Sequence, residues 1–317
     1  MSHVTFGTTL GGFGGGLVSG PTLCRWAEEI EQLGYDILFY RDHVLWHSPV
    51  LDPFTMLGAF AARTTKIKLG TGVLLLPLRN PTLVAKMIGS LDWLSGGRSI
   101  LGVGVGGEFQ KEYEACGISL RERGRRATEG LRVIKELWTN PSATCDDQFL
   151  QFEAAQMTPR PLQQPHPPIW VGGRVDAALK RAGTYGDGWF AYFVTPERFR
   201  TSLDKALEHW HQREASSRTM FTGGVVLYFC IAPTYEAARA NAMHTLSTEY
   251  NQSFDRIIDK YSALGPASEC AAAIQRYIDA GAQNMTLLPA VPAAATMDQL
   301  RHLATDVLPH LHSSPSP

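Results

Sequence analysis

The chain has 317 residues, of which 44% are hydrophobic and 19% charged, with 29 basic and 30 acidic side chains. This balance lacks the basic excess of proteins that bind nucleic-acid phosphates, so we expect no nucleic-acid partner. Since no composition shift or long linker divides the chain, we predict one domain over residues 1–317. Residues 312–317, HSSPSP, are expected to form a disordered tail.

The sequence favours a cytoplasmic location without membrane association. The first residues, MSHVTFGTTLGG, lack the charged and apolar segments of a secretory signal. No apolar run approaches the roughly 18 residues of a membrane span. The five cysteines are dispersed without a Cys-x-x-Cys pair, which fits a reducing compartment and predicts neither a disulfide framework nor a metal site.

Short apolar segments alternate with helical patterns along the first half of the chain. Strands are expected over residues 4–10, 36–42, 66–76 and 99–105. Helices are expected over 21–33, 53–63, 81–95 and 125–138, where apolar residues recur at helical spacing. Asp52, directly before Pro53, is typical of a helix N-cap.

The same alternation returns after residues 140–168, a proline-rich stretch that we interpret as an insertion that can contain a hairpin. Further strands are expected over 168–173, 187–193, 223–232 and 284–289, with helices over 175–183, 196–213, 235–249 and 267–280. Alternating strands and helices imply parallel strands joined by crossovers. Eight such units in roughly 300 residues predict an α/β fold, a closed (β/α)8 TIM barrel, in preference to an open sheet.

The glycine-rich stretch LGVGVGGEFQ (101–110) has several possible explanations. A dinucleotide-binding turn follows the first strand of its unit and leads into a helix, whereas these glycines follow the fourth expected strand and lie partly within it. Small residues could instead let a barrel strand bend at its end. A glycine-lined strand end would also leave room for a flat ring at the barrel mouth, where such barrels carry their active sites.

Six segments together resemble the luciferase-like monooxygenase superfamily. Its members are barrel oxidoreductases that use reduced FMN or the deazaflavin coenzyme F-420. These segments include RDHVLW, PPIWVGGR and GDGWF, and span residues 41–46, 51–81, 91–117, 167–174, 186–190 and 277–289. The resemblance covers nearly the whole chain and keeps the expected order. It implies a cofactor, either coenzyme F-420 or FMN, and a homodimer.

Two residues are candidates for proton transfer. His43 ends the second expected strand, and an imidazole there could either pack against a neighbour or carry a proton. The resemblance implies that His43 lies near the reactive edge of the cofactor. Glu108 follows the glycines, where some members of the superfamily carry an acid, but a solvated glutamate is the alternative. Other members carry a tryptophan where this chain has Gly107, which widens the site.

The resemblance also implies a cofactor ring lying against the end of the third strand. A non-prolyl cis peptide occurs there in similar enzymes, and the matching bond joins Gly72 and Val73. An ordinary strand end with a glycine for clearance is the alternative. Gly106 is a further candidate contact, because a glycine at the strand end leaves space for the ring.

The stretch WVGGRVDAALKRA (170–182) is a candidate anion site. The amides of Gly172 and Gly173, the helix dipole and Arg174 could together hold a cofactor phosphate. The alternative is a tight turn with an exposed arginine. Many barrels bind phosphate after the seventh and eighth strands, whereas this turn follows the fifth. Thr195, after the sixth strand, is a second candidate contact.

The substrate is expected to be a small organic molecule. Phe13, Trp46 and Phe254 hint at an apolar pocket, and we expect the insertion at 140–168 and the loop near 250–265 to contact the substrate.

The leading hypothesis is an oxidoreductase that uses coenzyme F-420 for hydride transfer. One alternative is an FMNH2-dependent monooxygenase supplied by a separate flavin reductase. Others are a non-catalytic flavin-binding protein and a sugar-phosphate barrel enzyme. The chain has no Gly-x-Ser-x-Gly elbow and no His-Glu-x-x-His pair, which leaves a hydrolase or metal enzyme without a recognisable motif.

Overall fold

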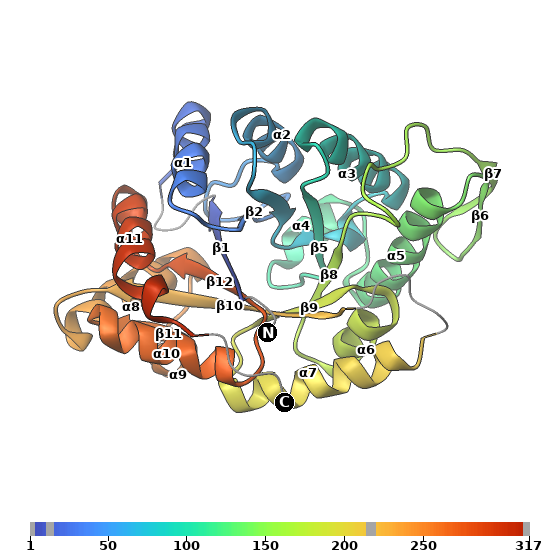
Figure 1. Ribbon diagram of the computed structural model, residues 1–317. Helices are drawn as coiled ribbons and strands as arrows, with labels where there is room; N and C mark the ends of the chain where they lie inside the picture. The colour runs from blue at the N-terminus through green and yellow to red at the C-terminus, as the bar shows by residue number, and fades with distance from the viewer. Residues whose placement is uncertain (1–3, 11–15, 214–219, 313–317) are drawn as a thin grey trace.

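The computed structural model describes residues 4–10, 16–213 and 220–312, so Phe13 and most of the expected tail lie outside the described residues. Eight parallel strands close into a barrel, and helices surround it (Figure 1). The barrel strands, in their order around it, are β1 (Thr5–Leu10), β2 (Ile37–Tyr40), β3 (Lys68–Thr71), β5 (Ser99–Gly104), β8 (Ile169–Gly172), β9 (Gly188–Tyr192), β10 (Thr222–Ile231) and β12 (Asn284–Pro289). Pairing of β12 with β1 closes the ring. The predicted TIM barrel is confirmed.

In the described part of the chain, eight longer helices surround the barrel, and five of them begin at a residue whose side chain caps the helix. The eight are α1 (Gly20–Gln32), α2 (Pro53–Arg63), α3 (Pro81–Ser95), α5 (Arg123–Thr139), α6 (Asp176–Tyr185), α7 (Pro196–His211), α8 (Tyr235–Tyr250) and α10 (Ala267–Asp279). Asp52 caps α2 as expected, because its carboxylate accepts hydrogen bonds from the amides of Phe54 and Thr55. Ser19, Asn80, Thr195 and Thr234 cap α1, α3, α7 and α8 in the same way.

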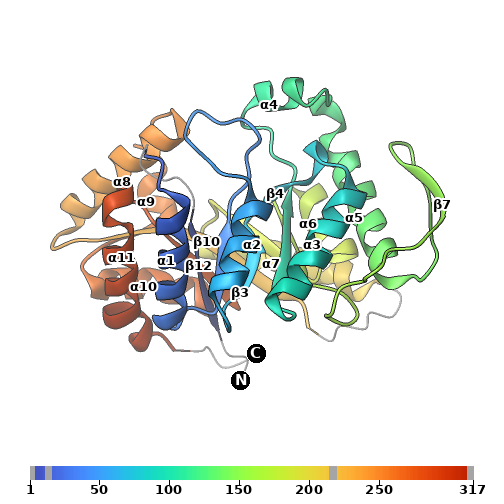
Figure 2. The same cartoon turned by 90° about the horizontal axis from the view of Figure 1, so that it is seen from above.

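The sequence pattern does not predict several shorter elements as separate segments, although β4 (Leu74–Leu75) falls within the strand expected over 66–76. These elements are β4, α4 (Gln110–Ala115), α9 (Ile258–Tyr261), β11 (Ser262–Gly265), α11 (Thr296–His302) and the short helical segments η1 (Leu76–Leu78), η2 (Leu120–Glu122), η3 (Ala293–Ala295), η4 (Leu303–Val307) and η5 (Leu308–His310). Elements this short contain too few residues to show a period. The most consequential is α4, which follows the glycine-rich stretch at one end of the barrel (Figure 2).

The insertion forms an antiparallel hairpin of β6 (Ala143–Asp146) and β7 (Gln151–Ala155). The hairpin stands at the side of the barrel beside α5 (Figure 2). None of the described residues that line the main cavity comes from residues 140–168. The expectation that this insertion contacts the substrate therefore finds no support in the cavity lining.

The glycines of β5 are required by backbone packing. A Cβ added to Gly102 would lie 2.1 Å from the carbonyl oxygen of Thr71, and one added to Gly104 would lie 2.6 Å from Cγ2 of Val73. Both positions let β5 approach the segment that leads from β3 to β4. The closed barrel excludes the open-sheet dinucleotide domain and supports the explanation that small residues shape a strand end.

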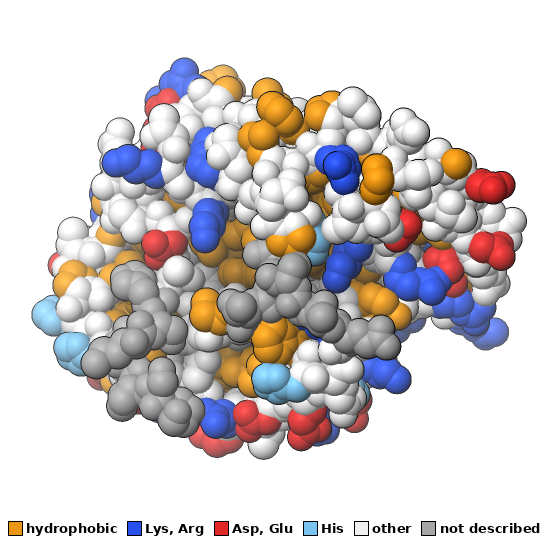
Figure 3. All heavy atoms as spheres, turned by 45° about the vertical axis from the view of Figure 1, so that its right-hand side comes forward, with side chains coloured by type: hydrophobic (Ala, Val, Ile, Leu, Met, Phe, Trp, Pro, Cys, Tyr) orange, Lys and Arg blue, Asp and Glu red, His pale blue; other side chains and the backbone are white. Residues whose placement is uncertain are grey.

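The surface shows no face of a single charge sign in the view of Figure 3, where basic and acidic side chains are interspersed. In the described part of the chain, no helix combines the length and apolar character that a membrane crossing requires.

The close approach of β3 and β5 leads to a stability prediction. Gly102→Ala places a methyl group against backbone and should lower the free energy of unfolding by about 1–3 kcal/mol. A Cβ at Gly58 on α2 would meet open space, so Gly58→Ala should raise the free energy of unfolding by about 0.5–1 kcal/mol. Urea denaturation of both variants checks the pair, and equal effects would contradict the packing explanation.

Candidate active site

The main cavity opens at the carboxyl ends of the barrel strands and has a volume of about 1050 Å³, including open solvent at its mouth. Residues from β1, β2, β3, β5, β8, β9, β10 and β12, or directly after them, contribute to its lining. They are Thr9, Arg41, Asp42, His43, Trp46, Gly72, Val73, Leu75, Gly104, Val105, Gly106, Glu108, Gly172, Gly173, Phe190, Tyr192, Val226, Tyr228, Tyr250 and Leu288. This is the end of the barrel at which TIM-barrel enzymes carry their active sites.

One side of the cavity is rich in glycine, and we call its five glycines the glycine wall. It consists of Gly72, Gly104, Gly106, Gly172 and Gly173, at the ends of β3, β5 and β8. The Gly72–Val73 peptide bond is cis, as the resemblance implies. Gly106 and Gly173 adopt φ angles of 55° and 133°, in the region that favours glycine. Backbone therefore forms much of this side of the cavity, together with the side chains of Val73 and Leu75.

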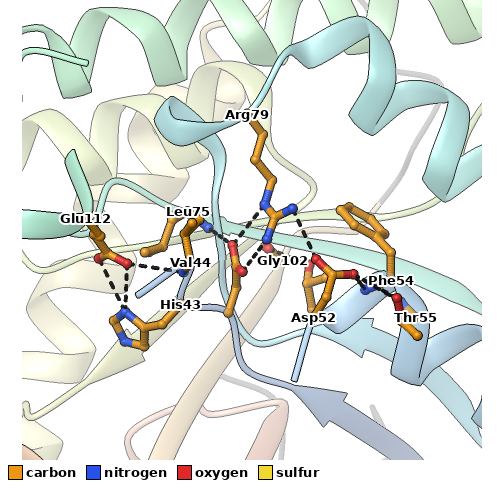
Figure 4. A network of polar contacts seen from close by, with 11 residues as sticks. His43, Val44, Asp52, Phe54, Thr55, Leu75, Arg79, Gly102 and Glu112 are labelled. Atoms are coloured by element: carbon orange, nitrogen blue, oxygen red, sulfur yellow. Dashed lines mark hydrogen bonds and ion pairs between the residues drawn. The ribbon is translucent and has the colours of Figure 1, made fainter. Parts of the chain in front are cut away.

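His43 points toward the cavity and is oriented by a buried carboxylate. Its Nδ1 lies 3.3 Å from both carboxylate oxygens of Glu112 on α4, and Oε2 of Glu112 also accepts the amide of Val44 at 3.2 Å (Figure 4). The Glu112 side chain is completely buried. Because Nδ1 faces the carboxylate, Nε2 is the nitrogen left to exchange a proton.

Trp46 packs directly on the imidazole. Its ring stacks on that of His43 with centroids 4.0 Å apart and an interplanar angle of 19°. Phe109 and Tyr250 meet the same indole edge-on. The imidazole is therefore held from one edge by Glu112 and on one face by Trp46.

Asp42 forms a buried ion pair on the other side of the strand end. Arg79 donates from Nη2 to Oδ1 at 2.5 Å and from Nε to Oδ2 at 3.2 Å, and Leu75 donates its amide to Oδ2 at 2.9 Å. Arg79 also reaches Asp52 (Figure 4). Burial opposes the charged guanidinium, but the hydrogen bonds and charges of Asp42 and Asp52 together outweigh burial and raise the pKa of Arg79. This pair fixes the chain directly before His43.

Arg41 makes a third ion pair, with Glu249 on α8. The Glu249 side chain is fully buried, and that of Arg41 is 11% exposed. On the next residue of α8, the hydroxyl of Tyr250 lies 2.6 Å from that of Tyr228 on β10. Burial raises the pKa of Tyr250 to about 12 and raises that of Tyr228 well above its ordinary value, so both phenols are neutral.

Glu108 lies at the rim of the cavity. The hydroxyl of Tyr192 donates a hydrogen bond to Oε1 of Glu108 at 3.3 Å. Burial raises the pKa of Tyr192, and the negative charge of Glu108 adds to that effect. The guanidinium of Arg174 lies over the Tyr192 ring, 4.9 Å from the centroid. Tyr192 thus separates the candidate acid from the candidate anion site.

The anion site predicted after the fifth barrel strand has the expected parts. Gly172 and Gly173 lead into α6, whose N-cap residue, Val175, offers no side-chain hydrogen bond to the first turn. Arg174 is exposed beside it and donates to the carbonyl of Phe193 at 3.4 Å. Thr195 lies on the next loop, where its hydroxyl accepts the amide of Arg198 and caps α7. An uncapped helix start with unhindered amides favours a bound anion.

The structure brings most of the sequence-predicted residues to one cavity. His43, Glu108, Gly72, Val73, Gly106, Gly172, Gly173 and Trp46 line it, while Arg174 and Thr195 lie outside the described lining. Phe254 is buried against Tyr250, with ring centroids 5.3 Å apart, and does not line the cavity. Sequence reasoning missed Glu112, Arg41 and Tyr228, because their partners lie far away along the chain. Tyr250, at the start of the loop near 250–265 that we expect to contact the substrate, does line the cavity.

A scan against protein-family models matches the luciferase-like monooxygenase model over residues 5–298. The chain belongs to the luciferase-like monooxygenase family. It is 29% identical to an F-420-dependent glucose-6-phosphate dehydrogenase of Kineococcus radiotolerans, over 91% of this chain and 92% of that protein. It is 31% identical over 189 residues to an FMNH(2)-dependent dimethylsulfone monooxygenase of Pseudomonas putida, covering 59% of this chain and 50% of that protein.

Other relatives add fold information. This chain is 39% identical over 141 residues to three uncharacterized mycobacterial proteins, and the match covers 48% of each of those proteins. Among solved structures, an F-420-dependent secondary alcohol dehydrogenase in complex with an F-420-acetone adduct has a TM-score of 0.83 and 19% identity, covering 98% of this chain and 99% of that one. Named relatives in this family are oxidoreductases and monooxygenases that use F-420 or FMN.

The residues present fit a flavin-type cofactor. The glycine wall would accept a planar ring, and the amides at the start of α6 would accept a phosphate.

The buried Asp42–Arg79 pair yields a second prediction. Arg79→Met removes the cation and leaves a completely buried carboxylate, so the free energy of unfolding should fall by about 3–5 kcal/mol. Adding Asp42→Asn should restore part of that loss. Arg200→Met breaks an exposed pair with Asp204 and should cost about 0–1 kcal/mol. A double-variant cycle in urea checks this, and additive losses at Asp42 and Arg79 would refute the coupling.

Proposed function

We propose that the protein is a cytoplasmic oxidoreductase that uses coenzyme F-420 to transfer a hydride to or from a carbon of a small organic substrate. The observation that carries this proposal is His43, which Glu112 holds beside the glycine wall with Nε2 left for a substrate oxygen. The relative with F-420-dependent dehydrogenase activity, which aligns over nearly all of both chains, supports the same assignment.

The residues of the chain supply positioning and proton transfer. Gly72, Val73 and Gly106 would support the cofactor ring, and Gly172, Gly173 and Arg174 would hold its phosphate, with Thr195 nearby. When bound, the oxidised deazaflavin accepts a hydride from the substrate carbon.

His43 handles the proton of the same reaction. In the direction of alcohol oxidation, the substrate hydroxyl gives its proton to Nε2 of His43 as the carbon–oxygen double bond forms and the carbon loses its hydride. Glu112 stabilises the imidazolium that results, because its carboxylate faces Nδ1. Glu108 would act at the rim as a second proton carrier, hydrogen-bonded to Tyr192.

A second candidate is an FMNH2-dependent monooxygenase with a separate flavin reductase as partner. The match to the dimethylsulfone monooxygenase favours it, and the glycine wall would accept either tricyclic ring. In both cases we expect a homodimer. Titration with F-420 and with reduced FMN separates the two, because the cofactor that the protein uses should bind more tightly.

The anion site leads to a binding prediction. Arg174→Ala should weaken binding of the preferred cofactor about tenfold, because a charged contact to the phosphate is lost. Arg200→Ala on α7 removes an equally exposed arginine far from the cavity lining and should leave affinity unchanged. Fluorescence titration measures both. Unchanged affinity in the Arg174 variant would remove this residue from the phosphate site.

The imidazole leads to a kinetic prediction. His43→Asn should lower kcat about 10²–10⁴-fold while cofactor affinity stays near that of the wild type. Glu112→Gln should lower kcat about tenfold or more, because the imidazole loses its oriented anion. Glu114→Gln, exposed on the same short helix, is the matched control and should behave like the wild type. Turnover with a panel of small alcohols under F-420 saturation measures these rates. A His43 variant of wild-type activity would overturn the assignment.

A further inference from the structure

The wall of the cavity that faces the glycine wall differs from it in chemistry. Around the closed barrel, β10 and β12 lie opposite β3 and β5. Their contribution to the lining is Val226 and Tyr228 from β10 and Leu288 from β12. Tyr250, the last residue of α8, completes this surface, which we call the phenol wall.

The phenol wall is uncharged and supported from behind. The hydroxyls of Tyr228 and Tyr250 lie 2.6 Å apart, and burial keeps both phenols protonated by raising each pKa. Phe193 stacks on Tyr228 with centroids 5.6 Å apart, and Phe254 lies 5.3 Å from Tyr250. The wall therefore presents aromatic and aliphatic carbon to whatever lies between it and the glycine wall.

The basic side chains that line the cavity already face carboxylates within the protein. Arg41 pairs with Glu249, and Asp42 pairs with Arg79. His43 faces Glu112. Among the described lining residues, Arg41 and His43 are the basic ones, and Glu108 adds a negative charge at the rim. Among the described lining residues, a phosphate or carboxylate group on a substrate would meet no cation that does not already face a carboxylate.

We propose that the substrate is an uncharged alcohol, or the matching carbonyl compound, whose hydrocarbon body packs against the phenol wall, and that phosphorylated sugars are excluded. The proposal rests on the function proposed above, with the substrate oxygen at Nε2 of His43. Tyr250 is its specificity-determining residue, because its ring lies between the substrate space and Phe254 and also meets Trp46 edge-on.

The test measures binding directly, by saturation-transfer NMR, with cyclohexanol and glucose 6-phosphate as probes. Wild-type protein is used without cofactor and again with saturating F-420. We expect cyclohexanol to bind at least tenfold more tightly than glucose 6-phosphate. Tyr250→Ala should weaken cyclohexanol about tenfold, and Tyr250→Phe, which keeps the ring, should stay within about threefold of the wild type.

Tyr261→Ala is the matched control, because Tyr261 also contacts Phe193 but does not line the cavity, and it should leave cyclohexanol binding unchanged. Thermal unfolding verifies that each variant is folded. If Tyr250→Ala does not fold, the proposal is judged by Tyr250→Phe and by the ratio of the two probes.

Equal or tighter binding of glucose 6-phosphate, no binding of cyclohexanol, or an unchanged Tyr250→Ala affinity would each overturn the proposed substrate class. Failure of the wild-type protein to bind F-420 is a separate result and would overturn the proposed function. Since cyclohexanol is also measured without cofactor, the two failures can be distinguished.

Discussion

Three consecutive residues directly after β2 hold the site together, and each contacts a charged side chain from a different part of the chain. Arg41 pairs with Glu249 on α8, and Asp42 pairs with Arg79, which follows β4 along the chain. His43 contacts Glu112 on α4. All three carboxylates have fully buried side chains. A buried charge is costly unless it is paired, so these contacts tolerate little displacement. The segment Arg41–His43 thereby ties three surrounding elements to one strand end and fixes where the imidazole lies.

The glycine wall depends on a different constraint, which is the close approach of backbones. Gly102 and Gly104 are required because β5 packs against the chain between β3 and β4, and Gly72 because a Cβ there would lie 2.8 Å from Cβ of Phe39. A barrel whose strands approach this closely would need these glycines even without a cofactor. Gly72 and Gly104 also line one side of the cavity. Residues that packing requires therefore lie in the candidate binding site, and a glycine motif alone cannot separate packing from binding.

Sequence periodicity predicted the eight barrel strands and the major helices, because each segment was long enough to show a period and several helices carried a readable N-cap. The position of His43 at a strand end, and hence at the mouth, followed from that order. Glu112 could not be predicted, because α4 spans only six residues and the contact with His43 joins positions 69 residues apart. Phe254 was expected to face the substrate, but α8 ends at Tyr250, which takes the lining position and leaves Phe254 behind it. Such choices depend on where a helix stops relative to the barrel.

Glu112 is the residue that the fold alone explains least. Its carboxylate has no exposed surface, and among the described residues its hydrogen-bond partners are His43 and the amide of Val44. An apolar side chain at this position of α4 would avoid the desolvation cost of a buried carboxylate. The cost is understandable if the carboxylate sets the tautomer of His43 and stabilises its protonated form. Local conflicts of this kind concentrate at functional sites, because selection for activity there overrides selection for stability. The buried carboxylate, more than the glycines, therefore indicates that this cavity carries out chemistry.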